Sequence, residues 1–317
     1  MNLSSHQKML LGIAIGDAYG AGYEFRYPDL KDYQNIPLDK YIKSAFPNSD
    51  HIRGMYTDDT QMSIAVTELL LSDKGFNKEN LADKFVECYK RNPIQGYAKG
   101  FQAFLDSINS GKEFIEKIRH NSIRNGAAMR AAPLGVVEDL DTLIEYAKIN
   151  ARLTHSTPKG IASSVAVALM SHISLYEGFA YTDKDVVRSR IVPQMMKIDM
   201  ETAKYIDDVL KMGDLDPVLL FGEAHSTMGV PCDGMRTVGA MIHLLTNFYG
   251  PREILEESVR LGGDVDSVAS ISLGIGLTND DIGSLPSFLF DDLTNHAYGR
   301  DYLLSLGNSL EKKFPIY

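Results

Sequence analysis

Two short acidic stretches carry the residue types that bind divalent metal ions. In TDDT, residues 57–60, two adjacent carboxylates stand between threonine hydroxyls, directly before an apolar helical pattern. In GGDVDS, residues 262–267, two further carboxylates and a serine hydroxyl again stand where a helical pattern begins, after two glycines that allow a sharp backbone turn. Carboxylate and hydroxyl oxygens are hard ligands that suit Mg²⁺, Ca²⁺ or Mn²⁺ rather than zinc. Both stretches therefore offer ligands for such an ion.

Each stretch taken alone also has a structural explanation. Asp58 and Asp59 lie where they would complement a helix dipole, which stabilises a helix by about 0.3–1 kcal/mol for each charge. Asp264 and Asp266 fit an Asx-type cap. If all four converged, their repulsion in a partly buried site would favour a pair of divalent ions between them. The sequence does not show convergence, so both interpretations remain open.

Two familiar aspartate motifs do not fit. An EF-hand loop beginning at Asp264 would need Asp or Asn at Val268. The DDxxD pattern of Mg²⁺-dependent prenyl synthases would need Asp at Met62. A third stretch, residues 12–25, sets Asp17 and Glu24 among glycines but lacks the patterns of nucleotide-binding loops. Its glycines at 12, 16 and 20 predict either close helix packing or a close approach to a ligand.

Helices must position these groups. Apolar residues recur every three to four positions along most of the chain, and no convincing alternation of period two, typical of strands, occurs. No linker rich in Gly, Ser or Pro divides the chain, so we expect one all-α domain over residues 1–317. The segment from Phe25 to Tyr56 breaks the pattern with Pro28, Pro37 and Pro47. Irregular segments of that length are often lids, and this one joins Glu24 to TDDT.

Composition narrows the class of protein. The chain has 317 residues, 44% of them hydrophobic, and a net charge of −10. The negative charge argues against a nucleic-acid-binding surface. Two cysteines allow no disulfide framework, and we expect a reducing compartment, the cytoplasm. The apolar run near the N-terminus is soon followed by Asp17, so we expect a core helix there. The chain contains no run of 18 apolar residues, so we expect no membrane span.

Five motifs, in order and over nearly the whole chain, resemble the ADP-ribosylglycohydrolase family. They are GDAYGAGYE (16–24), YTDDTQMSIAVTELLL (56–71), NGAAMRAAPLG (125–135), THSTPKGIASSVAVAL (154–169) and LGGDVDSVASI (261–271). The resemblance implies a compact orthogonal bundle of helices with a two-metal cleft that holds two Mg²⁺ or Mn²⁺ ions. It also implies a hydrolase that acts alone as a monomer.

The resemblance carries roles onto individual positions. The metal ligands it implies are Thr57, Asp58, Asp59, Asp264, Asp266 and Ser267, where Ser267 stands in place of a common Thr. The catalytic residues it implies are Glu24, Asp58, Asp59 and Asp266, with Glu24 as the candidate for acid/base work or for gating the leaving group. The substrate-binding residues it implies are Gly96, Tyr97, Gly100, Asn125, Gly126, Met129 and His155. A structural role for His155 stays open, because structural histidines are common.

Two departures from the family pattern affect the predicted substrate. Gln95 and Ala98 replace an Arg and a Gly that are common in the loop before Gly100. Asn279, Asp280 and Asp281 replace small residues, and we expect them to alter the pocket for the leaving group.

The reaction implied is removal of ADP-ribose from a modified protein or small molecule by cleavage at the anomeric carbon of the distal ribose. Such cleavage needs stabilisation of an oxocarbenium-like transition state. Arginine-linked ADP-ribose is the first expectation, serine-linked the second, and bases or small molecules a third. The alternative is a family member that binds ADP-ribose without turning it over.

Overall fold

The computed structural model describes residues 3–26, 31, 36–44, 52–178 and 183–316. Within these residues the chain forms α-helices and short 3₁₀ helices and no strand, which confirms the all-α prediction. The α-helices are α1 (Ser5–Gly20), α2 (Asp58–Leu71), α3 (Lys78–Arg91), α4 (Lys99–Ser107), α5 (Gly111–Lys117), α6 (Gly126–Met129), α7 (Leu140–Arg152), α8 (Pro158–Glu177), α9 (Lys184–Met196), α10 (Met200–Lys211), α11 (Pro217–Phe221), α12 (Gly234–Asn247), α13 (Gly250–Arg260), α14 (Val265–Gly276), α15 (Phe288–Asp291) and α16 (Arg300–Lys313). The 3₁₀ helices are η2 (Ala132–Val136), η3 (Glu223–His225), η4 (Leu277–Asn279) and η5 (Ile282–Ser284).

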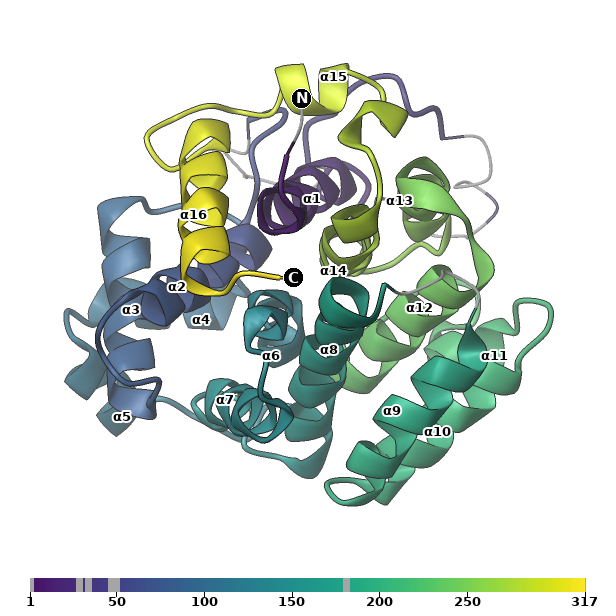
Figure 1. Ribbon diagram of the computed structural model, residues 1–317, viewed down its shortest axis with the longest axis horizontal. Helices are drawn as coiled ribbons and strands as arrows, with labels where there is room; N and C mark the ends of the chain where they lie inside the picture. Colours follow the sequence, from purple (N-terminus) through teal and green to yellow (C-terminus); the bar gives the residue numbers. More distant parts are fainter. Residues whose placement is uncertain (1–2, 27–30, 32–35, 45–51, 179–182, 317) are drawn as a thin grey trace.

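A pair of buried helices, α1 and α14, forms the centre of the molecule. They lie side by side in the middle of Figure 1, and each is buried on nearly all sides. A methyl group added at Gly16 would lie 2.3 Å from the carbonyl oxygen of Ala269, and one at Gly20 would lie 2.4 Å from the Cα of Asp266. The glycines therefore allow backbone-to-backbone contact, as the packing interpretation predicted. This contact brings the end of α1 beside the start of α14.

The other helices surround this pair. Helices α2, α3 and α16 pack on one side, and α8, α12 and α13 on the other (Figure 1). Amphipathic helices such as α10 and α13 bury one stripe and expose the other. Asn77 caps α3, because its side chain accepts a hydrogen bond of 2.9 Å from the N–H of Asn80. No helix among the described residues is long and apolar enough to cross a membrane.

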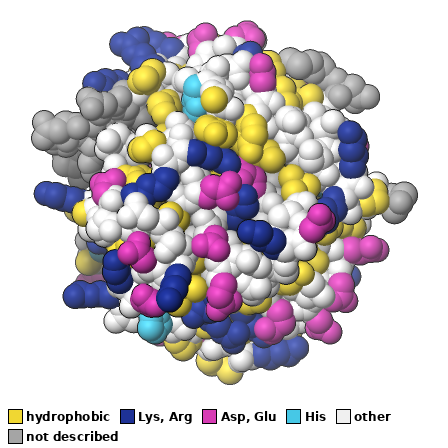
Figure 2. All heavy atoms as spheres, turned by 90° about the vertical axis from the view of Figure 1, so that its left-hand side faces the viewer, with side chains coloured by type: hydrophobic (Ala, Val, Ile, Leu, Met, Phe, Trp, Pro, Cys, Tyr) yellow, Lys and Arg dark blue, Asp and Glu magenta, His cyan; other side chains and the backbone are white. Residues whose placement is uncertain are grey.

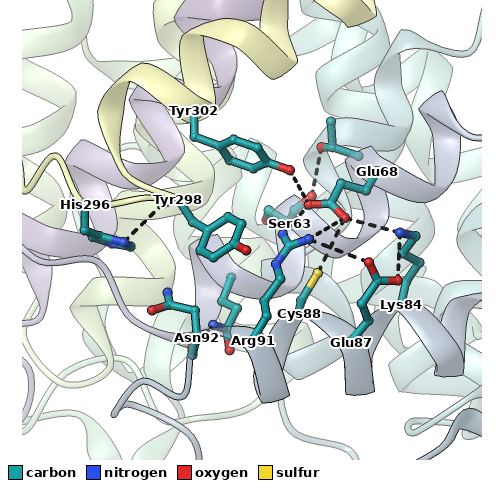
Figure 3. A network of polar contacts seen from close by, with 12 residues as sticks. Ser63, Glu68, Lys84, Glu87, Cys88, Arg91, Asn92, His296, Tyr298 and Tyr302 are labelled. Carbon is teal, nitrogen blue, oxygen red and sulfur yellow. Dashed lines mark hydrogen bonds and ion pairs between the residues drawn. The ribbon is translucent and has the colours of Figure 1, made fainter.

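A buried ionic network joins α2, α3 and α16 (Figure 3). Glu68 of α2 binds Arg91 and Lys84 of α3, and the Tyr302 hydroxyl of α16 donates to it at 2.6 Å. This network gives a buried carboxylate several donors at once. On the face that lies to the left in Figure 1, acidic and basic side chains are interspersed (Figure 2).

The predicted lid falls largely outside the part of the chain that the structure describes. Of its three prolines, Pro37 is described, whereas Pro28 and Pro47 lie outside the described residues. The lid therefore remains a prediction.

Candidate active site and metal centre

A cavity of about 880 Å³ brings the predicted site residues together. It is lined by every predicted metal ligand and by every predicted substrate-binding residue except Gly100. The predicted residues in its lining are Glu24, Thr57, Asp58, Asp59, Gly96, Tyr97, Asn125, Gly126, Met129, His155, Asp264, Asp266 and Ser267. Residues separated by up to about 240 positions in the sequence thus meet at one place.

Asp17 caps the helix that carries the first acidic pair. Its carboxylate accepts hydrogen bonds from the N–H of Thr57 at 2.9 Å and from the N–H of Thr60 at 3.0 Å. It also accepts from both threonine hydroxyls, at 2.7 and 2.6 Å. A carboxylate of α1 thus satisfies the start of α2, whereas Asp58 and Asp59 lie in its first turn, where they complement the helix dipole as expected. Since Thr57 gives its hydroxyl proton to Asp17, the lone pairs of that oxygen remain free to face a cation.

The second acidic pair stands on a tight turn before α14. Gly262 and Gly263 have φ values of +68° and +79°, which confirms that the glycines allow a sharp backbone turn. Asp264 caps no N–H of its own helix, and its carboxylate instead accepts a 2.6 Å hydrogen bond from Nδ2 of Asn125. Asp266 accepts a 2.8 Å bond from the N–H of Ser267. These bonds orient both carboxylates without neutralising their charge.

Glu24 joins the second pair from the end of α1. Carboxylate oxygens of Glu24, Asp264 and Asp266 all lie within 4.8 Å of one another, a group that could hold a metal ion. The next residue, Phe25, has a φ of +44°, a region that non-glycine residues seldom adopt. Its N–H donates to the carbonyl of Gly263 at 2.9 Å, which fixes the turn that presents Glu24.

The electrostatics of this cluster fit a bound cation. No lysine or arginine of the described residues forms an ion pair with any of its five carboxylates, and Oδ1 of Asp59 is buried without a hydrogen-bond partner. Burial raises the pKa of Asp58, Asp59 and Asp266 well above the usual range, and the neighbouring carboxylates raise it further. An orphaned buried oxygen among repelling carboxylates is what a divalent ion would complete.

The loop before α4 forms one wall of the cavity. Gly96 has a φ of +123°, and a methyl group there would lie 2.6 Å from Oδ1 of Asp58. Tyr97 is buried, and its hydroxyl donates to Oε1 of Gln61 at 2.8 Å. Gly100 is exposed in the first turn of α4 and has no atom within 4 Å of the place where a methyl would lie. The predicted substrate loop thus lines the cavity from Gln95 to Lys99, and α4 continues the lining from Phe101, whereas Gly100 itself does not line it.

Another part of the wall comes from α6 and from the turn before α8, where Thr154 and His155 lie. A methyl group at Gly126 would lie 2.9 Å from Cε1 of His155, so glycine allows these two residues to touch. Arg130 also lines the cavity, although it is only 1% exposed, and the sequence interpretation did not select it. Its position in the motif NGAAMR was the available signal, since a buried arginine needs many acceptors.

Two further findings concern residues outside the predicted set. Cys232 lines the cavity beside the acidic cluster, although nothing in its sequence context marked it. The expected change of the pocket by Asn279 to Asp281 is wrong for the cavity described here, because none of these residues lines it. Instead Nδ2 of Asn279 donates to the carbonyl of Ser174 at 2.7 Å, a contact between η4 and α8.

An all-helical bundle with paired acidic helix starts facing one cavity fits a protein that binds divalent metal ions. The family model of the ADP-ribosylglycohydrolases matches residues 3–314, and the chain belongs to that family. It is 26% identical over 324 residues to the ADP-ribosylhydrolase ARH3 of Danio rerio, covering 90% of this chain and 85% of that protein. It is 24% identical over 309 residues to the ADP-ribosylhydrolase ARH3 of Homo sapiens, covering 86% and 84%.

A solved structure described as an ADP-ribosylglycohydrolase-related protein complex has the same fold. It aligns with a TM-score of 0.70 at 22% identity, over 98% of this chain and 97% of that one. The predicted ADP-ribosylglycohydrolase type of helical bundle is thereby confirmed.

Proposed function

We propose that this protein is a metal-dependent hydrolase that removes ADP-ribose from a mono-ADP-ribosylated acceptor. The bond cleaved would be the glycosidic bond at the anomeric carbon of the distal ribose. The observation that carries the proposal is the convergence of five carboxylates in one cavity without a basic partner among the described residues. Membership of the family and the names of the ARH3 relatives support the reaction class.

The proposed metal ligands are Thr57, Asp58, Asp59, Asp264, Asp266 and Ser267. When bound, two Mg²⁺ or Mn²⁺ ions would offset the negative charge, hold ribose hydroxyls and activate water as Lewis acids. The chain's own residues prepare this arrangement. Asp17 fixes the start of α2 through Thr57 and Thr60, and Asn125 fixes the carboxylate of Asp264.

Glu24 is the proposed acid/base residue. Burial raises its pKa well above the usual range, and Asp266 and Asp264 raise it further. A carboxyl group with a raised pKa can hold a proton near neutral pH, as general acids in glycoside hydrolysis do. Glu24 would give that proton to the leaving acceptor, while Asp58, Asp59 and Asp266 stay ionised beside bound cations.

Substrate binding is assigned to the cavity walls on either side of this cluster. The proposed contacts are Gly96, Tyr97, Asn125, Gly126, Met129 and His155. Arginine-linked ADP-ribose is our first proposal for the substrate and serine-linked ADP-ribose the second, and we propose that the protein acts as a monomer in the cytoplasm.

The test measures free ADP-ribose released from arginine-linked and serine-linked ADP-ribosyl peptides. Each peptide is assayed with Mg²⁺, with Mn²⁺ and with EDTA. We expect metal-dependent release from one peptide that an Asp58→Asn variant loses and that Asp73→Asn retains, since Asp73 is exposed and lies outside the cavity. Binding of ADP-ribose without release from either peptide would instead support the family member that binds but does not hydrolyse.

A further inference from the structure

His155 presents one unpartnered ring nitrogen to the cavity. Its side chain is only 7% exposed and lines the cavity. Its Nδ1 lies 2.6 Å from the hydroxyl oxygen of Thr154, whereas its Nε2 has no partner among the described residues. A ring nitrogen left without a partner in so buried a side chain points to a ligand that supplies one.

Arg130 determines which way the bond between Thr154 and His155 runs. A guanidinium can only donate, and Nη2 of Arg130 lies 2.8 Å from the hydroxyl oxygen of Thr154, so that oxygen accepts. The hydroxyl then has its own hydrogen left, and its one other partner among the described residues is Nδ1 of His155. Thr154 therefore donates to Nδ1, which places the imidazole hydrogen on Nε2.

The guanidinium is itself held rigidly by neutral groups. Nε donates to Oδ1 of Asn150 at 2.7 Å, and Nη2 also donates to the carbonyl of Asn150 at 2.9 Å. Nη1 donates to the carbonyl of Gly126 at 2.7 Å and contacts Sδ of Met62 at 3.7 Å. No carboxylate is among these partners, so no ion pair neutralises the positive charge of Arg130, and Asp58 stabilises that charge only through its electrostatic field.

The same arrangement keeps the imidazole neutral. Burial lowers the pKa of His155 to about 3, and the charge of Arg130 contributes to the lowering. A protonated imidazole would be repelled by Arg130, and a hydrogen on Nδ1 would leave the hydroxyl hydrogen of Thr154 without an acceptor among the described residues. An acid/base role for His155 needs a nitrogen that gains and loses a proton at working pH, and neither nitrogen here meets that need.

We propose that Arg130 and Thr154 are positioning residues that lock His155 in the neutral tautomer protonated at Nε2, so that it donates a fixed hydrogen bond to an anionic oxygen of bound ADP-ribose. This inference rests on the proposed function for the identity of the ligand. The buried charge of Arg130 adds a favourable field for a diphosphate at the same wall. This wall would thus bind a different part of the ligand from the part that faces the proposed metal ligands.

The experiment replaces the hydroxyl of Thr154 and reads the tautomer directly. Thr154→Val removes the donor to Nδ1 at nearly constant volume, and Thr154→Ser retains it. Thr246→Val is the matched control, because it also deletes a buried hydroxyl, one that donates to Ile242 away from the cavity. The tautomer of His155 is read from ¹⁵N spectra of histidine-labelled, ligand-free protein, and the Kd for ADP-ribose from titration calorimetry.

We expect the wild type, Thr154→Ser and Thr246→Val to show the Nε2–H form and to bind ADP-ribose alike. Thr154→Val should show a mixture of tautomers and a Kd about tenfold higher, in proportion to one weakened hydrogen bond to a charged group. Thermal melts check that each variant is folded at the temperature of the titration.

Three results would overturn the inference. They are an Nδ1–H tautomer in the wild type, an unchanged tautomer and Kd in Thr154→Val, and no binding of ADP-ribose by the wild type. Failure of the proposed hydrolysis is distinguishable from all three, because neither the spectrum nor the calorimetry requires turnover.

Discussion

Helix α2 carries buried carboxylates at both ends, and the two ends are treated in opposite ways. Near its end, Glu68 binds Arg91, Lys84 and the hydroxyl of Tyr302 (Figure 3). At its start, Asp58 and Asp59 form no ion pair with any described basic residue. Burial alone would raise the pKa of Glu68, but its bonds to Arg91 and Tyr302 outweigh burial and lower it. Burial and like charges raise the pKa of the aspartates.

The difference separates a structural carboxylate from a functional one. A buried charge with its partners in place is complete, and the protein gains nothing by offering it to a ligand. A buried charge without partners costs stability and persists only where something else completes it. Both ends of α2 carry acidic residues close to a helix terminus. What distinguishes the two ends is whether basic side chains form ion pairs with those residues.

The largest expected effect comes from Asp59→Asn. Its orphaned Oδ1 is a proposed metal ligand, and loss of several kcal/mol of metal-dependent stabilisation would reduce ADP-ribose release about 1,000-fold. The same change removes one of several repelling charges, so in EDTA the variant should unfold at a higher temperature than the wild type. Both quantities are measured on one preparation, by product release and by thermal melts. If the variant lost activity and also unfolded at a lower temperature in EDTA, the charge of Asp59 would not be destabilising. The comparison between the two ends of α2 would then be wrong.

Glu68→Gln should have the opposite signature. It removes the carboxylate that Arg91 and Lys84 share and leaves Glu87 as their remaining acidic partner, which costs about 1–3 kcal/mol. We expect urea unfolding at a lower midpoint, with metal-dependent release within about twofold of the wild type. A Glu68→Gln variant as stable as the wild type would show that the network does not support the fold.

The pH dependence of metal stabilisation is a smaller effect. Burial is the main cause that raises the pKa of Asp17 from 3.8 to about 6, although hydrogen bonds from Thr60 and Thr57 act to lower it. A group with a raised folded pKa stabilises the protein below its unfolded pKa and loses that contribution as the pH rises through the folded value. Without metal, the free energy of unfolding should therefore fall as the pH rises from 5 to 7, by about 1 kcal/mol for each carboxyl group that behaves like Asp17.

A bound cation reverses that trend, because it favours the ionised carboxylates. The difference between unfolding free energies in Mg²⁺ and in EDTA should thus grow from pH 5 to pH 7. Buried histidines such as His6 and His172, whose pKa burial lowers, destabilise the fold as the pH falls below about 6.5. These histidines destabilise the fold with and without metal, so their contribution cancels in the difference between the two unfolding free energies. A difference that is constant over this range would contradict ion binding at the cluster.

The sequence predicted what depends on local pattern. Helical periodicity, the glycines on α1, the turn at Gly262 and Gly263, and the hard oxygen ligands are all properties of neighbouring residues. The pairing of helix ends is not local. Asp17 caps a helix 40 residues further along the chain, and Arg130 finds its acceptors on α7 and beside α8.

Resemblance has a similar limit. The departures at Asn279 to Asp281 were expected to reshape the pocket, yet their segment packs against α8. A change of residue type in a motif shows that something differs there. Which surface it faces depends on contacts between helices that no motif encodes.

The smallest expected effect tests this limit within one loop. Gly96 and Gly100 were both predicted to bind substrate, and both lie in QGYAKG. At Gly96, with a φ of +123°, an added methyl would meet Asp58, so Gly96→Ala should raise KM about tenfold by disturbing that carboxylate. At Gly100 the methyl would meet nothing, and alanine in the first turn of α4 is favoured over glycine by up to about 1 kcal/mol. Gly100→Ala should therefore keep KM within about twofold of the wild type and leave the melting temperature equal or slightly higher. If Gly100→Ala raised KM and Gly96→Ala did not, the substrate would contact the exposed face of α4 at Gly100. The substrate site would then extend beyond the residues that line the cavity.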